Sequence, residues 1–273
     1  MDGIAAGTYH ARDMYEPELP TAAPRRRAIF LLPNLLTTGC LFSGFYAVVA
    51  AIDGNFERAG IAVFVAMIFD TLDGRMARLT HTESAFGKEY DSLADMVAFG
   101  LVPAIVSYQW GVARIAEYGR AWGRLGWLAA FFYCAAAALR LARFNTRVAT
   151  QDKRYFEGLP SPSAAAVVSG FVWVSSEWRE PGLTGLIVAF SVTAVAGALM
   201  VSSFSYPSFK KLDSSPVRFV WLVVAALVFV VIGIDPARAL LGCFGSYALW
   251  APLAWVWRRI RRARRSSGLS GGS

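Results

Sequence analysis

Long apolar stretches alternate with short polar segments along almost the whole chain. A helix that crosses a bilayer needs about 20 mostly apolar residues, and eight stretches approach that length. They are residues 35–52, 58–74, 93–112, 125–142, 162–177, 183–203, 217–234 and 237–257. The pattern therefore predicts an all-α, polytopic integral membrane bundle of about eight transmembrane helices, with little room for a separate soluble domain.

The composition also indicates a membrane protein. The chain has 273 residues, of which 56% are hydrophobic and only 17% are charged, and its mean hydropathy is +0.44. Residues 1–24 are mixed and polar and lack an apolar core, so we expect no cleavable signal peptide. We therefore expect a cytosolic N-terminal segment (1–28), one membrane domain (29–257) and a basic, flexible C-terminal tail (258–273).

The basic residues are distributed unevenly between the loops. Lys and Arg collect on the cytoplasmic loops of membrane proteins, and most of the 27 basic residues fall on one side if both termini are cytosolic. The hairpin that carries Arg114, Arg120 and Arg124 is the exception to this topology. Because the basic residues flank apolar stretches and form no domain of their own, the net charge of +8 indicates attraction to anionic lipid and no nucleic-acid partner.

Four aspartates stand where the second predicted span ends and the third begins. Asp70 and Asp73 continue one apolar helix, and Asp91 and Asp95 open the next. Residues three or four positions apart share a helix face, so each pair forms one acidic patch. The polar run between the pairs, with Gly87, is suited to turn the chain so that the two patches face each other.

Such a group of carboxylates near a bilayer needs compensating positive charge. Oxygen ligands suit hard cations, so we expect two Mg²⁺ or Mn²⁺ ions as cofactors. Two such ions can stabilise both the attacking and the leaving oxygen of a displacement at phosphorus. The alternative is a solvated cytosolic loop in which the aspartates pair with Arg and Lys, but the register with the apolar helices favours the metal site.

The same region resembles a known motif. Eight residues match the pattern D-x-x-D-G-x-x-A-R-x8-G-x3-D-x3-D without a gap: Asp70, Asp73, Gly74, Ala77, Arg78, Gly87, Asp91 and Asp95. This pattern is similar to the signature of the CDP-alcohol phosphatidyltransferases, integral membrane enzymes that join a CDP-activated lipid to an alcohol and release CMP. The multi-helix layout extends the resemblance over most of the chain.

The resemblance implies a role for each motif residue. All four aspartates would bind the metal ions, and Asp91 and Asp95 would form the catalytic centre, with Asp95 as the general base. The nucleotide would contact the small and basic motif residues and an upstream Pro-Asn-x-x-Thr element. This expected nucleotide-binding set is Asn34, Thr37, Gly74, Ala77, Arg78 and Gly87.

Three further stretches, "ALRLARFN", "FEGLPSPSAA" and "LMVSSFSYPSFK", resemble the serine-using branch of the family. The resemblance implies transfer of the phosphatidyl group from CDP-diacylglycerol to L-serine by a homodimer in a bacterial-type inner membrane, with its site at the cytosolic face. Contacts to the acceptor or to a lipid phosphate would come from Arg140, Arg143, Asn145 and Ser161. Arg140 and Arg143 lie one turn apart and serve equally well as positive-inside anchors.

Other functions remain open from the sequence. The same chemistry is compatible with another acceptor, such as glycerol phosphate, inositol phosphate or choline. Intramembrane aspartates are also typical of cation-coupled transporters. A non-catalytic membrane scaffold is the third possibility, and it predicts that Asp91 and Asp95 can be replaced without loss of function.

Overall fold

The computed structural model describes residues 24–147, 155–177, 182–207 and 219–269, and it is mostly helical. The elements in chain order are α1 (Pro24–Ile52), α2 (Phe56–Leu79), α3 (Ala85–Asp95), η1 (Met96–Leu101), α4 (Val102–Trp110), η2 (Val112–Tyr118), α5 (Arg120–Arg147), β1 (Tyr155–Glu157), α6 (Ser161–Ser175), α7 (Leu183–Val201), β2 (Ser205–Pro207), α8 (Phe219–Ile234) and α9 (Pro236–Leu269). Each of the eight predicted apolar stretches lies largely on one of these helices or, for 93–112, on the run from α3 to η2. The predicted helices are thus found where the hydrophobic pattern placed them.

The number of long apolar helices is smaller than eight. Within the described residues, five helical runs are long and apolar enough to cross a membrane: 31–52, 85–118, 120–146, 183–201 and 236–261. The other three predicted spans fall short for different reasons. Helix α2 carries charged residues at both ends, and α6 and α8 have only 15 and 16 residues. The five runs and the wider apolar pattern make this an integral membrane protein.

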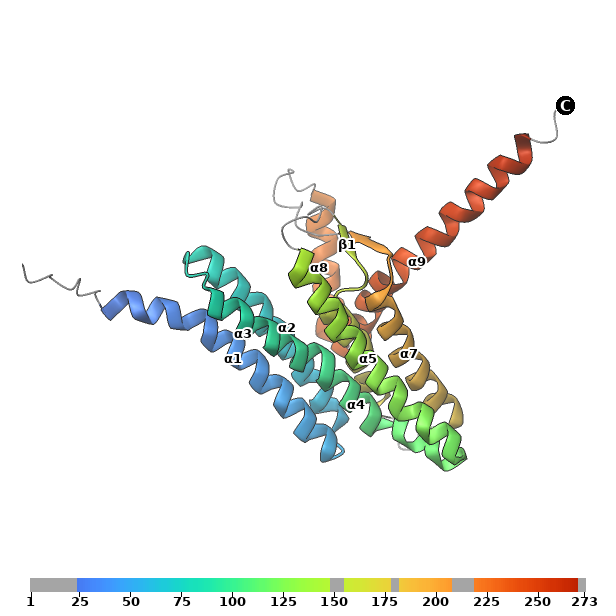
Figure 1. The fold of residues 1–273 in the computed structure, drawn as a ribbon, viewed down its shortest axis with the longest axis horizontal. Helices are drawn as coiled ribbons and strands as arrows, with labels where there is room; N and C mark the ends of the chain where they lie inside the picture. Colours follow the sequence, from blue (N-terminus) through green and yellow to red (C-terminus); the bar gives the residue numbers. More distant parts are fainter. Residues whose placement is uncertain (1–23, 148–154, 178–181, 208–218, 270–273) are drawn as a thin grey trace, which may run out of the picture.

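Helix α6 is the centre of the bundle. It packs against α2, α4, α7 and α9. Helix α1 pairs with α2, and α5 pairs with α7 (Figure 1). Small residues allow this close packing: a Cβ atom on Gly60 of α2 would lie only 2.6 Å from the Cβ of Trp173 on α6. One hydrophobic cluster lies between α6 and the first helices, and a second lies between α6 and α5, α7 and α9.

The turn between α2 and α3 differs from the one that the sequence predicted. Helix α3 begins at Ala85, several residues before the predicted start of the next span, because the Ser84 side chain accepts a hydrogen bond from the Gly87 backbone N–H and caps the helix. Gly87 therefore lies in the first turn of α3. The residue with left-handed backbone geometry is His81, with φ of 53°.

The bundle also contains a small sheet, so the expectation of a purely helical chain was wrong in this detail. β1 and β2 pair antiparallel, with Phe156 opposite Tyr206. Gly158 follows β1 with φ of 78°, and a Cβ atom there would lie 2.2 Å from the Met200 carbonyl oxygen, so only glycine fits. The strands join the loop before α6 to the loop after α7.

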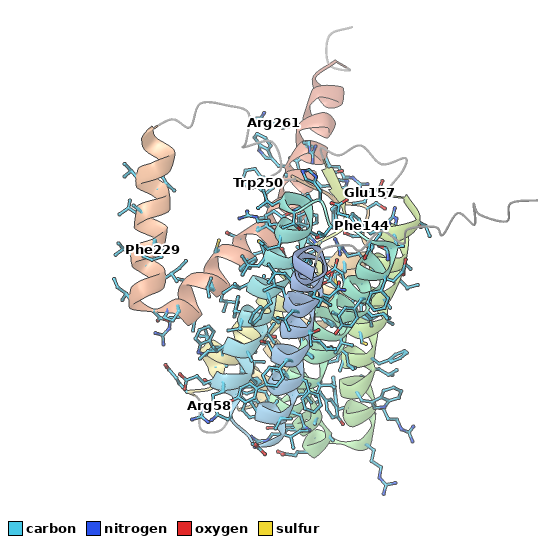
Figure 2. The ribbon with its side chains drawn as sticks, turned by 90° about the vertical axis from the view of Figure 1, so that its left-hand side faces the viewer. Arg58, Phe144, Glu157, Phe229, Trp250 and Arg261 are labelled. Atoms are coloured by element: carbon cyan, nitrogen blue, oxygen red, sulfur yellow. The ribbon has the colours of Figure 1, made fainter. Side chains whose placement is uncertain are left out.

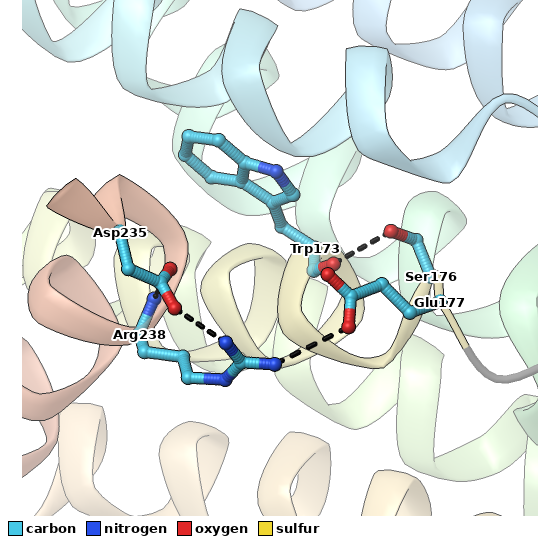
Figure 3. Close-up of polar contacts among 5 residues, drawn as sticks. All are labelled: Trp173, Ser176, Glu177, Asp235 and Arg238. Atoms are coloured by element: carbon cyan, nitrogen blue, oxygen red, sulfur yellow. Dashed lines mark hydrogen bonds and ion pairs between the residues drawn. The ribbon is translucent and has the colours of Figure 1, made fainter.

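The opposite end of α6 is tied to α9 by an exposed ionic network (Figure 3). The Arg238 guanidinium lies 2.5 Å from an Asp235 carboxylate oxygen and 3.2 Å from Glu177. The Arg238 backbone N–H, aided by its guanidinium, holds the pKa of the Asp235 carboxyl below its usual range. Exposed ion pairs add little stability, so this network mainly fixes how α9 starts.

Helix α8 and the C-terminal part of α9 extend away from the bundle. Helix α8 packs mainly against α9, and Figure 2 shows it standing apart with Phe229 pointing outward. Phe229 is 77% exposed, as expected for a side chain that faces lipid. Helix α9 continues through Arg258 to Leu269, so most of the segment that we expected to be a flexible tail is helical.

Candidate active site

Three of the four predicted aspartates converge at the α2–α3 hairpin. Carboxylate oxygens of Asp70, Asp91 and Asp95 all lie within 4.8 Å of one another. Asp70 comes from α2, and the other two are four residues apart on one face of α3. The hairpin therefore brings the two acidic patches together, as their spacing predicted.

The fourth aspartate is held from a third helix. Asp73 is buried, with 4% of its surface exposed, and its Oδ2 accepts a 2.7 Å hydrogen bond from the Thr37 hydroxyl of α1. Thr37 itself is 3% exposed. The hydrogen bond to Oδ2 fixes the orientation of the Asp73 carboxylate, and the other carboxylate oxygen can then bind a metal ion in a defined direction. Helix α1 therefore orients one of the four aspartates.

The donor set fits a hard divalent cation. Asp95 Oδ1 is buried and has no hydrogen-bond partner in the part of the chain that the structure describes. Leaving a buried carboxylate oxygen unpaired is costly, and three carboxylates this close repel one another. A cation with oxygen ligands at 2.0–2.6 Å removes both problems. We infer from this geometry that the cluster can hold metal.

The predicted nucleotide residues line both sides of the hairpin. A Cβ atom on Gly87 would lie 3.2 Å from Asn34 Oδ1, so α1 and α3 approach closely there. A Cβ atom on Gly74 would meet only the Arg78 guanidinium, at 3.9 Å. Ala77 is half-buried between these positions on α2. Gly74 is thus uncrowded beside the exposed Arg78 guanidinium, whereas the position of Gly87 is closely approached by Asn34.

Arg140 lies on α5 behind the aspartates. Its Nη1 donates a 2.9 Å hydrogen bond to the Ser161 hydroxyl at the start of α6. Its Nε is buried and lacks a hydrogen-bond partner among the described residues. The guanidinium is also near enough to Asp95 for their charges to attract each other. A half-buried cation with an unused donor near Asp95 is suited to bind an anionic group.

The other two predicted acceptor residues make contacts within the protein. Arg143 forms an ion pair with Glu157 of β1, and both side chains are partly exposed. Asn145 donates a 2.8 Å hydrogen bond to the Ser92 hydroxyl, next to Asp91 in the chain. Both contacts join the end of α5 to neighbouring elements, so their geometry favours a positioning role.

Sequence reasoning missed one residue that supports the site. The helix changes to a π-helical turn, η1, directly after Asp95, and such turns are frequent at functional sites. Pro103 has no N–H for the Phe99 carbonyl four residues earlier. Tyr133 of α5, which is fully buried, donates a 3.0 Å hydrogen bond to that carbonyl instead. The sequence shows that Pro103 lacks an N–H, which predicts that a carbonyl in this helix needs another donor. It does not show that Tyr133 is that donor.

Comparison with known proteins decides the family. The sequence profile described as CDP-alcohol phosphatidyltransferase matches residues 30–202, which includes the aspartates and α1 to α7. The chain belongs to this family. This profile match ends before α8, so the profile itself does not include α8 and α9.

Several curated relatives of this family member have specific names. One from Helicobacter pylori, named CDP-diacylglycerol–serine O-phosphatidyltransferase, is 36% identical over 236 residues, which cover 85% of this chain and 94% of the relative. An archaetidylserine synthase from Methanothermobacter thermautotrophicus is 35% identical over 64% of this chain and 69% of its own. A Saccharomyces cerevisiae protein with the same name as the first is 38% identical over 48% of this chain and 50% of its own.

Proposed function

We propose that this protein transfers the phosphatidyl group from CDP-diacylglycerol to the hydroxyl of L-serine, which gives phosphatidylserine and CMP. The observation that carries the proposal is the convergence of Asp70, Asp91 and Asp95 within 4.8 Å, on a motif that matches the family without a gap. The serine acceptor is supported by the name of a relative that aligns with 85% of this chain.

We assign the metal site to the four aspartates, with two Mg²⁺ or Mn²⁺ ions. Bound metal would neutralise the carboxylates and stabilise charge that develops on the diphosphate of the substrate. The ions would be bound directly by Asp70, Asp91 and Asp95. Asp73 would also bind them, through the carboxylate oxygen that is not hydrogen-bonded to Thr37. The unpaired Oδ1 of Asp95 supports this assignment.

We assign the general base to Asp95. Its carboxylate accepts the proton of the serine hydroxyl as that oxygen forms a bond to the lipid-linked phosphorus. The bond between the same phosphorus and the oxygen of CMP breaks, so CMP leaves with the electron pair. Asp91 lies one helical turn away on the same face and is a neighbouring ligand in the proposed metal site. The displacement is direct and requires no covalent enzyme intermediate.

We assign acceptor recognition to Arg140. Serine differs from simple alcohols by its carboxylate, and a guanidinium is a strong ligand for that group. The unused Nε donor of Arg140 and its nearness to Asp95 support this role, because the hydroxyl and the carboxylate of serine are only a few bonds apart. Ser161 fixes the guanidinium through Nη1.

We assign the cytidine diphosphate to the space beside the small motif residues. Gly74 leaves room at the backbone of α2, Gly87 lets Asn34 of α1 approach the backbone of α3, and Arg78 supplies a cation beside Gly74. Asn34 and Thr37 of α1, with Ala77 of α2, would complete the site. A guanidinium can bind phosphate through two parallel hydrogen bonds, so the exposed Arg78 is suited to hold a phosphate of the nucleotide.

We propose a topology with eight spans, both termini in the cytosol, and the active site at the cytosolic face of a bacterial-type inner membrane, in a homodimer. The distribution of Lys and Arg between the loops supports this orientation. Aspartates at the end of α2 would then lie at headgroup depth, where the phosphorus of a membrane lipid lies. CDP-diacylglycerol would enter from the bilayer, and serine and CMP would exchange with the cytosol.

The first test follows CMP release from purified protein in detergent with CDP-diacylglycerol and Mg²⁺ or Mn²⁺, with and without L-serine. We expect CMP release that depends on serine and that is lost in Asp95→Asn. The control is Asp235→Asn, which changes an exposed aspartate in the α8–α9 turn and should keep this release. Release only with glycerol phosphate, inositol phosphate or choline would retain the chemistry and reject serine. Ion flux without CMP release would instead indicate a cation-coupled transporter.

A further inference from the structure

A polar pocket lies between β2 and α9, outside the site described above. It has a volume of about 420 Å³ and is lined by Ser203, Phe204, Ser205, Ala251, Trp255, Arg258 and Arg259. None of the aspartates or predicted nucleotide residues lines it. A volume of this size is in the range of small-molecule sites, about 300–1,000 Å³.

Two arginines give the pocket a positive charge. Arg258 Nε donates a 3.1 Å hydrogen bond to the Ala254 carbonyl, and the Arg259 guanidinium lies 5.2 Å from the centre of the Trp255 ring. Neither has a carboxylate within ion-pair distance in the described part of the chain. Adjacent guanidinium groups on one pocket wall favour an anion, and guanidinium binds phosphate strongly.

The rest of the lining has two distinct parts. Phe204 and Trp255 pack edge to face with ring centres 5.9 Å apart, and with Ala251 they form an apolar floor. Ser203 and Ser205 add hydroxyl groups to the lining. A ligand that matches this lining has an anionic, hydrogen-bonding head and an apolar continuation.

The position of the pocket on α9 matches the depth of lipid headgroups. The apolar part of the helix ends with Trp255 and Trp257, which are 44% and 55% exposed, and an arginine-rich run follows from Arg258. Exposed tryptophans followed by basic residues are typical of the membrane–water interface. Phosphate groups of bilayer lipids lie at this level.

We propose that this pocket binds the phosphodiester headgroup of an anionic phospholipid. Arg258 and Arg259 bind the phosphate oxygens, the serines bind the headgroup hydroxyls, and Phe204 with Trp255 contacts the glycerol and the first acyl carbons. The site is separate from the proposed catalytic one and serves a second lipid. It does not depend on serine being the acceptor, because binding is measured without turnover.

The test measures equilibrium binding of dioleoyl phosphatidylglycerol and dioleoyl phosphatidylcholine to the full chain in detergent, by native mass spectrometry. Arg258→Gln and Arg259→Gln are compared with Arg261→Gln, a matched arginine on α9 that stacks on Trp257 at 3.6 Å and does not line the pocket. Each pocket variant is expected to weaken phosphatidylglycerol binding roughly five- to ten-fold, with the control within about two-fold.

Three other outcomes would overturn the proposal. Equal weakening in Arg261→Gln would show general attraction to the basic helix, and no change in the pocket variants would show that the arginines bind no lipid. Inorganic phosphate that competes with phosphatidylglycerol at equal concentration would identify free phosphate as the ligand. Retained CMP release by Arg258→Gln and Arg259→Gln, measured in the same preparations, shows that loss of binding is not loss of folding.

Discussion

The Tyr133 hydroxyl takes the place of a backbone N–H that Pro103 cannot supply, by donating a 3.0 Å hydrogen bond to the Phe99 carbonyl. This bond lies in the helical run that begins at α3 and carries Asp91 and Asp95. Proline in a helix removes a hydrogen bond and pushes against the carbonyl four residues earlier. Tyr133 thus stabilises the irregular turn on which the direction of Asp95 depends.

Tyr133→Phe is expected to lower the free energy of unfolding by about 1–3 kcal/mol, because the buried Phe99 carbonyl loses its donor. It is also expected to raise the metal concentration needed for half-maximal CMP release, because Asp95 is less well positioned. Thermal unfolding and a metal titration measure the two effects. Tyr108→Phe is the control, since Tyr108 lies in the same helical run and is only half-buried. An unchanged metal titration in Tyr133→Phe would limit Tyr133 to a structural role.

Thr37→Val should weaken metal activation by about ten-fold, in line with the loss of an outer-shell hydrogen bond to a metal-binding carboxylate. The change removes the 2.7 Å bond to Asp73 and keeps the size of the side chain. Thr37→Ser keeps the hydroxyl and should stay near the parent protein. A metal titration of CMP release separates the two variants. Equal behaviour of both would mean that Asp73 needs no orientation from α1.

Arg140→Gln is expected to raise the KM for serine by about 10- to 100-fold, the value of one or two charge-assisted hydrogen bonds. The KM for CDP-diacylglycerol should change much less. Initial rates of CMP release over a range of serine concentrations provide the measurement. Arg143→Gln is the matched control, since it lies one turn along α5 and pairs with Glu157.

The same experiment includes a gentler variant in case Arg140→Gln does not fold. Ser161→Ala removes only the hydroxyl that fixes Arg140 Nη1 and should raise the KM for serine several-fold. If both variants affect CDP-diacylglycerol and serine alike, Arg140 binds a lipid phosphate and the acceptor site lies elsewhere.

Gly87→Ala should impair use of CDP-diacylglycerol, because the added Cβ atom would lie 3.1 Å from Ser84 Oγ and 3.2 Å from Asn34 Oδ1. Asn34 must then move away from the space that we assign to the nucleotide. The KM for CDP-diacylglycerol is the quantity to measure. Gly245→Ala on α9 is the control: it has open space around it, and it should be neutral or stabilise the helix by up to about 1 kcal/mol.

Removal of divalent cations should abolish CMP release, and Mg²⁺ or Mn²⁺ should restore it. The reason is the mutual repulsion of the Asp70, Asp91 and Asp95 carboxylates within 4.8 Å, which a bound divalent cation relieves. Chelation is also expected to lower the temperature of thermal unfolding, because a ligand that binds only the folded state stabilises it. Full activity after dialysis against chelator would contradict the metal assignment.

The acidic hairpin could be predicted because local periodicity decides it. Spacings of three and four residues placed the aspartates of each pair on one face, and two apolar helices with a short turn brought the faces together. The exact turn could not be predicted, since several polar residues after Leu79 could cap the next helix and the sequence does not show that Ser84 does so. Helix starts depend on such single hydrogen bonds.

Contacts between distant segments could not be predicted from the sequence. Nothing in the periodicity of α5 shows that Asn145 reaches Ser92 or that Arg143 reaches Glu157. The pairing of β1 with β2 joins segments separated by two helices, and three-residue strands carry almost no pattern of their own. These features follow from the packing of α6 between its neighbours. The sequence indicates this packing only by its many small residues, which do not show which helices are in contact.

The shortness of α6 has a consequence for how water and lipid meet. Its 15 residues rise about 22 Å, whereas the hydrocarbon layer is about 30 Å thick. In the proposed topology Glu177 lies at the outer surface, and Ser161 and Arg140 would then lie several ångström beneath the opposite surface. A helix this short would make a local depression in the membrane. A charged amino acid could then reach a lipid phosphorus without either reactant crossing the hydrocarbon layer.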